Sequence, residues 1–474
     1  MEESKAAADG SKTGSGSAAT EHAATENLSH QIPFRDSLMV SVVTGLGYGF
    51  DAYAVNIYGL VLPLIAVSLG ADSVVTGLIG SALLVGYTIG TVGFGFAADK
   101  FGRKDTLGVS ILLYGATTTL AGLTHNIPFF AAMRFLTGVG GAGELAVGAP
   151  YTAEMWPAKV RALGVGGIMF SFYSAGYILT GLAALYIVPR YGWEWAFIIA
   201  IVPALAIFAL RLIAQESVRY VIAKTEHKFE AARALQAAQE EGSTRDRARA
   251  VRAIENAELQ ENSSREDGRH ERLWHIPGVK KRIGIGWLLF TANTFGYWAL
   301  TVFLTTFMVE KFGASLNEAI GYAIMFYVVQ FFFSYLGAGL SDWIGRRPAG
   351  IIGALLMMTV TILAATANSL PVFLIFGAIM IAMLGWLWAI GDTYVSEIFP
   401  TRVRGSCFGI SVGGGRLVSI SAPFLVGSGI AAFGPTVPLL ASAGLWVLTI
   451  IGYLLGPETS GKELEEIEEE MAAT

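Results

Sequence analysis

The sequence predicts an all-α integral membrane protein with twelve transmembrane helices in two pseudo-symmetric six-helix bundles. Hydrophobic residues make up 53% of the 474 residues and charged residues only 15%, with a mean hydropathy of +0.55. A soluble protein of this length needs more polar surface than that composition provides. The apolar residues are also grouped into long runs, and two motifs recur at one fixed spacing, which indicates an internal repeat.

Twelve apolar runs have about 20 residues or more, the length that a helix needs to cross roughly 30 Å of hydrocarbon. Helices are expected because lipid leaves each backbone polar group to be satisfied within its own segment. The predicted spans are residues 38–66, 74–98, 105–124, 127–153, 160–187, 194–214, 283–308, 316–340, 348–367, 370–397, 405–430 and 433–456.

The segments outside the spans divide the chain. Residues 1–37 are rich in small and polar residues and lack the apolar core of a signal peptide, so we expect a disordered cytoplasmic N-terminal tail. The two bundles are expected at 38–214 and 283–456. Residues 215–282 carry fourteen Lys or Arg and twelve Asp or Glu, which predicts a cytoplasmic helical linker without chemistry of its own. Residues 457–474 are predicted to form an acidic cytoplasmic C-terminal tail.

Two motifs recur with a spacing of 243 residues. GFAADKFGRK begins at Gly95 and returns as AGLSDWIGRR at Ala338, and EMWPAKVR begins at Glu154 and returns as EIFPTRVR at Glu397. A common spacing for two independent motifs indicates one helical unit used twice with almost no net insertion. Such duplicated halves are typical of membrane carriers.

Cationic residues are concentrated in alternate connections between the predicted spans, which places both termini in the cytoplasm. We therefore expect a multi-pass protein of the cell (plasma or inner) membrane, with the lipid bilayer as its surroundings and no nucleic-acid partner. Cys407 is the only cysteine, which excludes a disulfide within the chain and a cysteine-rich metal site. The cations on the cytoplasmic side are Lys100, Arg103, Lys104, Lys159, Arg161, Arg346, Arg347, Arg402 and Arg404, against Arg190 and Lys311 on the other.

The repeated motifs provide a candidate cytoplasmic gate. Gly102 and Gly345 permit the tight turn between two helices. Asp99 and Asp342 can accept hydrogen bonds from helix-end amides or pair with an arginine, which would form a clasp that opens as the halves move. The alternative is that these charges only set the topology. The other gate candidates are Arg103, Arg346, Glu154, Arg161, Glu397 and Arg404.

Charged residues inside the spans are candidates for proton coupling, because each is costly in hydrocarbon unless paired or hydrated. Asp51 lies about midway along the first span, and an Asp51–Arg134 pair would load and release a proton as its geometry changes; the alternative is a permanently ionised structural pair. Glu144 is either a second titrating group or a satisfied buried polar residue. All six histidines lie outside the spans, so a proton relay would use carboxylates.

Arg416 is the candidate substrate anchor, since a guanidinium is shaped for two-point contact with a carboxylate. Its alternative partner is Asp392 on the preceding span, and both interpretations hold if substrate competes with Asp392. The position 243 residues before Arg416 is Tyr173. Aromatic residues with few polar groups fit a planar ring better than a polyol. The remaining candidates for the cavity are Tyr53, Asn56, Tyr173, Asn293, Tyr297, Trp298, Gln330 and Trp388.

The Gly-x-x-x-Asp-x-x-Gly-Arg-Lys/Arg turn in both halves resembles the signature of the major facilitator superfamily, over nearly all of residues 38–467. RFLTGVG from Arg134, ESVR from Glu216 and PETSGKELEEI from Pro457 are similar to its sugar-porter-like branch. The Gln-Gln pair of true sugar porters is absent, because the corresponding stretch from Thr291 reads TANTFGYW. This stretch, the GGAGE run and the GGGR run resemble niacin-type and aromatic acid:proton symporters.

The resemblance implies the major facilitator fold and alternating access, carried out by a monomer without a cofactor or a metal. We expect symport of protons with a small organic carboxylate, with an aromatic acid such as nicotinate or benzoate favoured. One alternative keeps the fold and carries a sugar, polyol or phosphate; another is a receptor that binds without turnover. An enzyme is not expected, since no nucleophile–base pair or metal cluster is apparent in the sequence.

Overall fold

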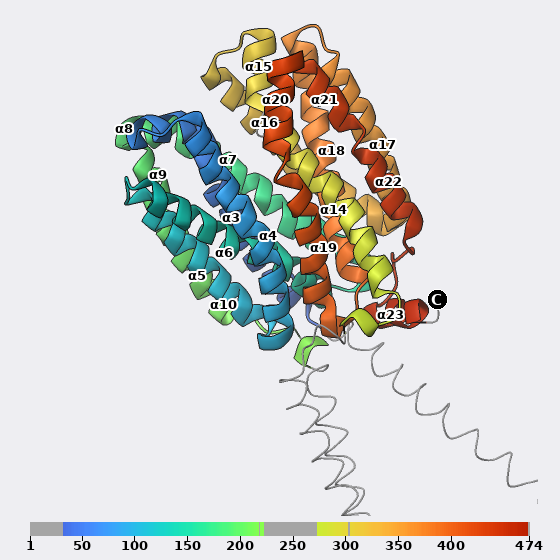
Figure 1. Cartoon of the computed structure of the whole chain (residues 1–474). Helices are drawn as coiled ribbons and strands as arrows, with labels where there is room; N and C mark the ends of the chain where they lie inside the picture. The colour runs from blue at the N-terminus through green and yellow to red at the C-terminus, as the bar shows by residue number, and fades with distance from the viewer. Residues whose placement is uncertain (1–31, 218, 222–272, 302–303, 473–474) are drawn as a thin grey trace, which may run out of the picture.

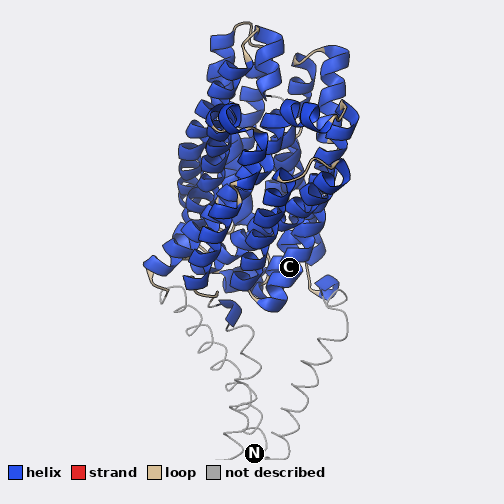
Figure 2. Cartoon of the chain, turned by 90° about the vertical axis from the view of Figure 1, so that its left-hand side faces the viewer, coloured by secondary structure: helices blue, strands red, loops and turns tan. Residues whose placement is uncertain are grey.

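The computed structural model describes residues 32–217, 219–221, 273–301 and 304–472, and all regular structure in these residues is helical (Figure 2). The helices of the first half are α3 (Phe34–Leu69), α4 (Ser73–Phe101), α5 (Arg103–Gly122), α6 (Ile127–Met155), η1 (Ala158–Val160), η2 (Leu163–Met169), α7 (Phe170–Tyr186), α8 (Val188–Tyr191), α9 (Trp193–Ile198) and α10 (Ile201–Ile213). Those of the second half are α14 (Val279–Thr301), α15 (Leu304–Phe312), α16 (Leu316–Ile344), α17 (Arg346–Ala365), α18 (Leu370–Glu397), η3 (Thr401–Val403), α19 (Arg404–Ser419), α20 (Ala422–Phe433), α21 (Thr436–Ala443), α22 (Trp446–Leu455) and α23 (Leu464–Ala472).

The internal repeat extends to the helix bounds. The same spacing of 243 residues carries both ends of α4 onto those of α16, both ends of α5 onto those of α17, and the short turn η1 onto η3. Residues 36–58 of α3 correspond to α14, and the end of α3 corresponds to the end of α15. The two halves therefore fold alike because they share a pattern of helices and turns.

Within the described residues, nine helical stretches are long and apolar enough to cross a membrane, judged by length and composition. The three other predicted spans correspond to α5, α6 and α14, which have 20, 29 and 23 residues. The count of twelve crossings stays a prediction. α6 carries Arg134 and Glu144, both buried, so its polar groups face protein rather than lipid.

The predicted boundaries differ slightly from the observed ones. α3 begins at Phe34, so residues 34–37 belong to the first helix rather than to the predicted tail, of which residues 1–31 lie outside the described residues. Most of the predicted linker, residues 222–272, also lies outside them. The predicted acidic C-terminal segment includes α23.

The two halves lie next to each other, with α3–α10 toward the left and α15–α22 toward the right in Figure 1. They converge at the lower end of that view, where the C-terminus lies, and diverge toward the end that carries α8 and α15. The start of α3 lies at the converging end too, because the Trp156 indole beyond α6 donates to the Ser37 carbonyl (3.1 Å). We call this end the clasp end and the other the open end.

Glycines fix two features of the clasp end. Gly102 and Gly345 have φ of 107° and 105°, a region that favours glycine, and each ends one helix and starts the next. Gly95 on α4 allows close approach to the other half, because a Cβ there would lie 2.4 Å from the Gly405 carbonyl oxygen of α19. Small residues bring helix backbones into contact in this way.

Candidate functional site

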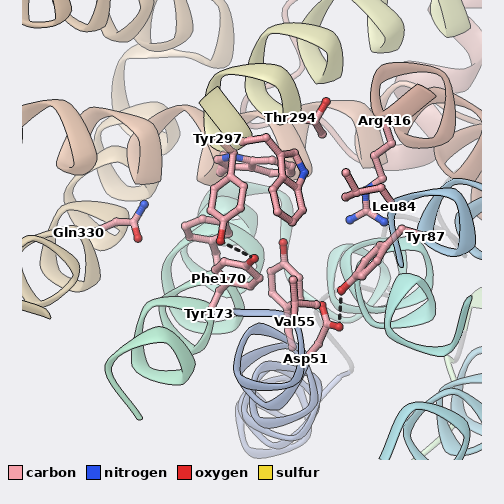
Figure 3. Close-up of a pocket in the computed structure, with 13 residues that line it drawn as sticks. Asp51, Val55, Leu84, Tyr87, Phe170, Tyr173, Thr294, Tyr297, Gln330 and Arg416 are labelled. Carbon is pink, nitrogen blue, oxygen red and sulfur yellow. Dashed lines mark hydrogen bonds between the residues drawn. The ribbon is translucent and has the colours of Figure 1, made fainter. Parts of the chain in front are cut away.

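A cavity lies between the two halves, with an empty volume of about 620 Å³ that includes space open to solvent (Figure 3). Its walls are mostly aromatic, and its polar groups are few. It is lined by Tyr48, Asp51 and Val55 of α3, Leu84 and Tyr87 of α4, Phe170 and Tyr173 of α7, Thr294, Tyr297 and Trp298 of α14, Gln330 of α16, Trp388 of α18 and Arg416 of α19.

Arg416 is the one cation among the lining residues. Its guanidinium lies over the Tyr87 ring, 4.3 Å from the centroid, and donates to the Thr91 hydroxyl at 2.8 Å. Both partners belong to α4, so Arg416 reaches from α19 of the second half to the first. No carboxylate of the described residues lies within salt-bridge distance of it, so within that part of the chain its charge has no ionic partner.

Asp51 is the one carboxylate among the lining residues. It is 1% exposed and accepts a hydrogen bond from the Tyr87 hydroxyl, as Figure 3 shows. Gly141 of α6 makes room for this pair, since a Cβ there would lie 2.1 Å from Asp51 Oδ1. Tyr87 thus touches the carboxylate with its hydroxyl and Arg416 with its ring.

Three further hydrogen bonds connect the halves beside the cavity. The Tyr173 hydroxyl of α7 donates to the Tyr297 hydroxyl of α14 at 3.0 Å, and the Ser174 hydroxyl donates to Gln330 Oε1 at 3.0 Å. The Tyr297 hydroxyl also donates to Asn56 Oδ1 at 3.1 Å. Because all of these side chains are neutral, the two halves can separate here without leaving an isolated charge.

The clasp end is closed by contacts between the halves. Asp99, at the end of α4, accepts hydrogen bonds from the backbone amides of Gly405 (3.1 Å) and Ser406 (2.7 Å) at the start of α19. It also pairs with Arg103 at 3.1 Å. A carboxylate at a helix N-terminus is stabilised by the unpaired amides and by the helix dipole.

Asp342 repeats this arrangement from the other half. It lies at the end of α16 and accepts from the amides of Ala162 (3.2 Å) and Leu163 (3.1 Å), where the helical segment leading into α7 begins. It pairs with Arg346 at 2.6 Å. Each half therefore caps a helix of the other, with matching residues on both sides.

Glu154 and Glu397 form the buried centre of the clasp. Glu154 pairs with Arg103 of its own half at 3.0 Å and with Arg404 of the other half at 3.1 Å. Glu397 pairs with Arg346 of its own half at 3.0 Å and with Arg161 of the other at 3.2 Å. The side chains of all six residues are at most 1% exposed, so every one of these charges depends on its partners.

A family model for sugar (and other) transporters matches residues 20–471, most of the chain. The chain belongs to this family. It is a membrane transporter with the major facilitator fold, as the sequence predicts, and not an enzyme.

The chain is similar to the niacin transporter NiaP of Acinetobacter baylyi, with 25% identity over 90% of this chain and 95% of that protein. It is similar to the cis,cis-muconate transport protein of the same organism, with 26% identity over 84% and 87% of the two chains. The solved structure of the proton:xylose symporter XylE superimposes with a TM-score of 0.72, at 22% identity, over 91% of this chain and 98% of that one. That likeness shows the fold.

The transporter differs from the sequence prediction at Arg134. The predicted Asp51–Arg134 pair is not formed in this conformation, because Arg134 donates to the carbonyls of Ala54 (2.8 Å) and Val55 (3.2 Å). Its guanidinium also lies 5.1 Å from the Tyr58 ring centroid. Arg134 is therefore held on the backbone of α3, one turn beyond Asp51, and Tyr87 takes the place beside the carboxylate.

Glu144 also lies outside the cavity. It forms a buried ion pair with Arg211 of α10, and Ser110 donates to it at 3.2 Å. The prediction overlooked Arg211, although it lies inside the span predicted at 194–214. The interpretation of Glu144 as a satisfied buried residue fits this geometry better than a second proton site does.

Four predicted cavity residues do not line the cavity. The Tyr53 hydroxyl donates to the Ala196 carbonyl at 2.6 Å within the first half, and the Asn293 amide donates to the Leu387 carbonyl at 3.4 Å. Asn56 donates to the Ala52 carbonyl at 2.7 Å and reaches the site only through Tyr297. Asp392 is buried and is not among the lining residues. The side chains of Tyr53, Asn293 and Asn56 bond to a neighbouring helix or to their own backbone, which helical spacing alone does not reveal.

Sequence reasoning missed several residues that the fold brings to the two sites. Glu216 and Glu458 accept hydrogen bonds from the first amides of α5 and α17, at Arg103 (3.0 Å) and Arg346 (2.8 Å). Both belong to the ESVR and PETSG segments, so a signal was present, but its physical role was not apparent. In the cavity the missed residues are Tyr48, Val55, Leu84, Tyr87, Phe170 and Thr294. Among the described residues no group of three potential metal-ligating side chains occurs.

Proposed function

We propose that this transporter is a proton-coupled symporter of a small aromatic carboxylate, working as a monomer by alternating access. The observation that carries the proposal is Arg416, a cavity cation whose charge has no carboxylate partner among the described residues. An organic anion would supply that partner, and a guanidinium binds a carboxylate through two parallel hydrogen bonds. The rings of Tyr173, Tyr297 and Trp388 offer flat apolar surfaces for an aromatic ring.

Asp51 is the proposed proton site. Its carboxylate reaches the cavity, and its neutralisation would remove a negative charge from the place that an anionic substrate must enter. The hydroxyl of Tyr87 contacts this carboxylate, and the ring of Tyr87 contacts Arg416. Proton binding at Asp51 and substrate binding at Arg416 therefore both affect the Tyr87 side chain. Arg134 contributes through its electrostatic field and its hold on α3 rather than by direct contact.

The clasp is the proposed cytoplasmic gate, and both termini are then in the cytoplasm. The proposed location of the protein is the plasma or inner membrane. With the clasp closed and the halves diverging at the other end, we interpret the conformation as outward-facing. Opening requires the helix caps and the Glu154 and Glu397 pairs to separate as the halves rock.

Counterflow in proteoliposomes tests transport directly. Vesicles preloaded with unlabelled nicotinate or benzoate should accumulate the labelled acid transiently, whereas a receptor without turnover would bind but not accumulate label. Competition by unlabelled benzoate, muconate, xylose and phosphate then ranks the substrate classes. If xylose competes and the carboxylates do not, the transporter is a sugar symporter and the proposal is wrong.

Asp51→Asn tests the proton site. Exchange needs only the loaded carrier to reorient, while uphill uptake also needs the empty carrier to return after releasing its proton. The amide imitates the protonated acid, so the variant should bind and exchange substrate but lose accumulation driven by a pH gradient. Retained gradient-driven uptake would move the proton site to another carboxyl group.

A further inference from the structure

Asp392 on α18 is a buried carboxyl group that the proposed mechanism leaves without a role. It is 0% exposed, and neither of its carboxyl oxygens has a hydrogen-bond partner among the described residues. Trp388, four residues earlier and on the same face of the helix, lines the cavity. Because α18 ends at Glu397 in the clasp, Asp392 lies about 6 Å from Trp388 along the helix axis, toward the clasp.

Aromatic rings pack around Trp388 at this level of α18. The Trp388 ring is stacked with Phe170 of the first half, with centroids 6.2 Å apart and an angle of 14°, and lies 6.0 Å from the Phe290 ring. Asp392 lies one turn further along α18 and is not among the residues that line the cavity. It therefore occupies the region between the substrate site and the clasp, which water would reach when the clasp opens.

Few ionisable groups face Asp392. Among the described residues, those in electrostatic range are Tyr48 of α3, Tyr453 of α22 and Arg416 of α19, and of these three only Arg416 carries a charge. Arg416 is at present turned to the first half, on Thr91 and Tyr87. A buried carboxylate without a donor or an ion partner is unfavourable, so the surroundings of Asp392 in this conformation suit the neutral acid better than the anion.

We propose that Asp392 is a second proton-binding site, so that two protons accompany each carboxylate anion; this rests on the proposed function of the cavity. Substrate and Asp392 compete for Arg416. While a substrate carboxylate holds the guanidinium, Asp392 stays protonated. When the substrate leaves toward the clasp side, Arg416 turns to Asp392, which releases its proton to the water there and becomes a paired carboxylate. The pair breaks again when Asp392 is reprotonated on the outward side.

The charge balance distinguishes one proton from two. One proton with one monovalent anion moves no net charge, whereas two protons with the anion move one positive charge inward. One charge moving through 100 mV corresponds to about 2.3 kcal/mol, which is about a fiftyfold difference in accumulation at equilibrium. In proteoliposomes with equal pH on both sides, an inside-negative potassium diffusion potential of that size should therefore drive uptake of labelled nicotinate or benzoate.

Variants of Asp392 test whether this residue carries the second proton. Asp392→Asn should abolish the potential-driven component, so that the roughly fiftyfold ratio falls to about one, while Asp392→Glu should restore it. Asp105→Asn, a change of the same kind at an exposed position on α5, should behave as wild type. Potential-independent uptake by the wild type, or potential-driven uptake by Asp392→Asn, would overturn the second proton site and leave the proposed symport intact. Absence of any carboxylate uptake would instead contradict the proposed function.

The protonation of Asp392 can also be measured without substrate. In the outward-facing conformation described here, the infrared spectrum of the purified empty transporter at neutral pH should contain the carbonyl stretching band of a protonated carboxyl group, and the difference spectrum against Asp392→Asn should show its loss. The Asp105→Asn spectrum should not show this change. If Asp392→Asn removes no such band, Asp392 is not a proton carrier in this state and the proposal fails whatever the substrate is.

Discussion

The clasp and the cavity are built by the same internal repeat, but they use it differently. In the clasp, residues 243 apart are chemically the same: Asp99 and Asp342, Arg103 and Arg346, Glu154 and Glu397, and Arg161 and Arg404. In the cavity, residues 243 apart occupy corresponding positions with different chemistry: Asp51 and Thr294, Val55 and Trp298, Tyr87 and Gln330, and Tyr173 and Arg416.

The difference follows from what each region must do. When two similar halves rock against each other, both must form and break equivalent contacts. Identical helix caps and ion pairs on the two sides meet this requirement. A small ligand with one charged end is not symmetric, and two guanidinium groups in one enclosed cavity would repel each other. The repeat therefore supplies positions in the cavity, while the individual side chains supply the specificity.

The largest expected effect comes from the centre of the clasp. Glu154→Gln removes the buried carboxylate that pairs with Arg404, and Glu397→Gln removes the one that pairs with Arg161, whereas Arg103 and Arg346 keep Asp99 and Asp342. Losing one partner of a buried pair is unfavourable by about 3–5 kcal/mol. Both variants should lower the thermal unfolding temperature of the purified protein to a similar extent. A large effect at one site with none at the other would break the equivalence of the two halves.

Arg416→Lys is expected to have the next largest effect, on substrate binding rather than on folding. The ammonium keeps the charge but lacks the planar pair of donors, which predicts a loss of about 1.5–3 kcal/mol, or roughly tenfold to more than a hundredfold in affinity. Tyr173→Phe, at the repeat-related position, is the matched comparison and should weaken binding much less. Equal effects in titration calorimetry would show that the asymmetry of the cavity does not decide recognition.

Asp99→Asn and Asp342→Asn test the helix caps. An amide still accepts a hydrogen bond but loses the charge that the helix dipole stabilises, a change of about 1–2 kcal/mol in a buried site. Both should shift the population toward inward-facing states, and by similar amounts. The shift is measured by labelling single cysteines engineered at the open end in a Cys407→Ser background. Unchanged labelling would mean that these charges only set topology.

Tyr87→Phe should have the smallest effect and the most local one. The variant keeps the ring below Arg416 but removes the hydroxyl that donates a hydrogen bond to Asp51. Such a bond contributes about 1 kcal/mol, and it favours the ionised form of the carboxyl group. The proton should then bind more tightly, and the alkaline limb of the uptake–pH profile should move up by less than one pH unit. Substrate affinity at low pH should stay the same. A loss of affinity there would place the hydroxyl in the substrate site.

The gate residues could be predicted because each repeated motif appears twice and carries its own physical signature. A glycine at a helix turn, an acid one turn before it and an arginine directly after it leave few alternatives for Asp99, Gly102 and Arg103. The ion pairs between the two halves were harder to predict from the sequence. That Glu154 binds Arg404 rather than only residues of its own half depends on how the two bundles meet.

The cavity was predicted less well for a related reason. Helical periodicity assigns a residue to a face, but it does not say which neighbour that face meets. Arg134 satisfies backbone carbonyls of α3, and Glu144 found a partner in Arg211, while Tyr53 bonds within its own half. Tyr87 gave no signal in sequence, since its importance arises only because Asp51 and Arg416 lie on either side of it.

The sequence by itself determined that the chain is helical, that it crosses a membrane and that its two halves repeat, because these properties follow from local composition, run length and spacing. The tertiary structure decided which buried charges are paired. Asp99 and Asp342 each gained the N-terminal amides of a helix from the opposite half, Glu144 gained Arg211, and Asp392 gained no partner among the described residues. In a nonpolar interior the state of a charge depends on the few atoms within hydrogen-bond distance, and those atoms come from segments far apart in sequence.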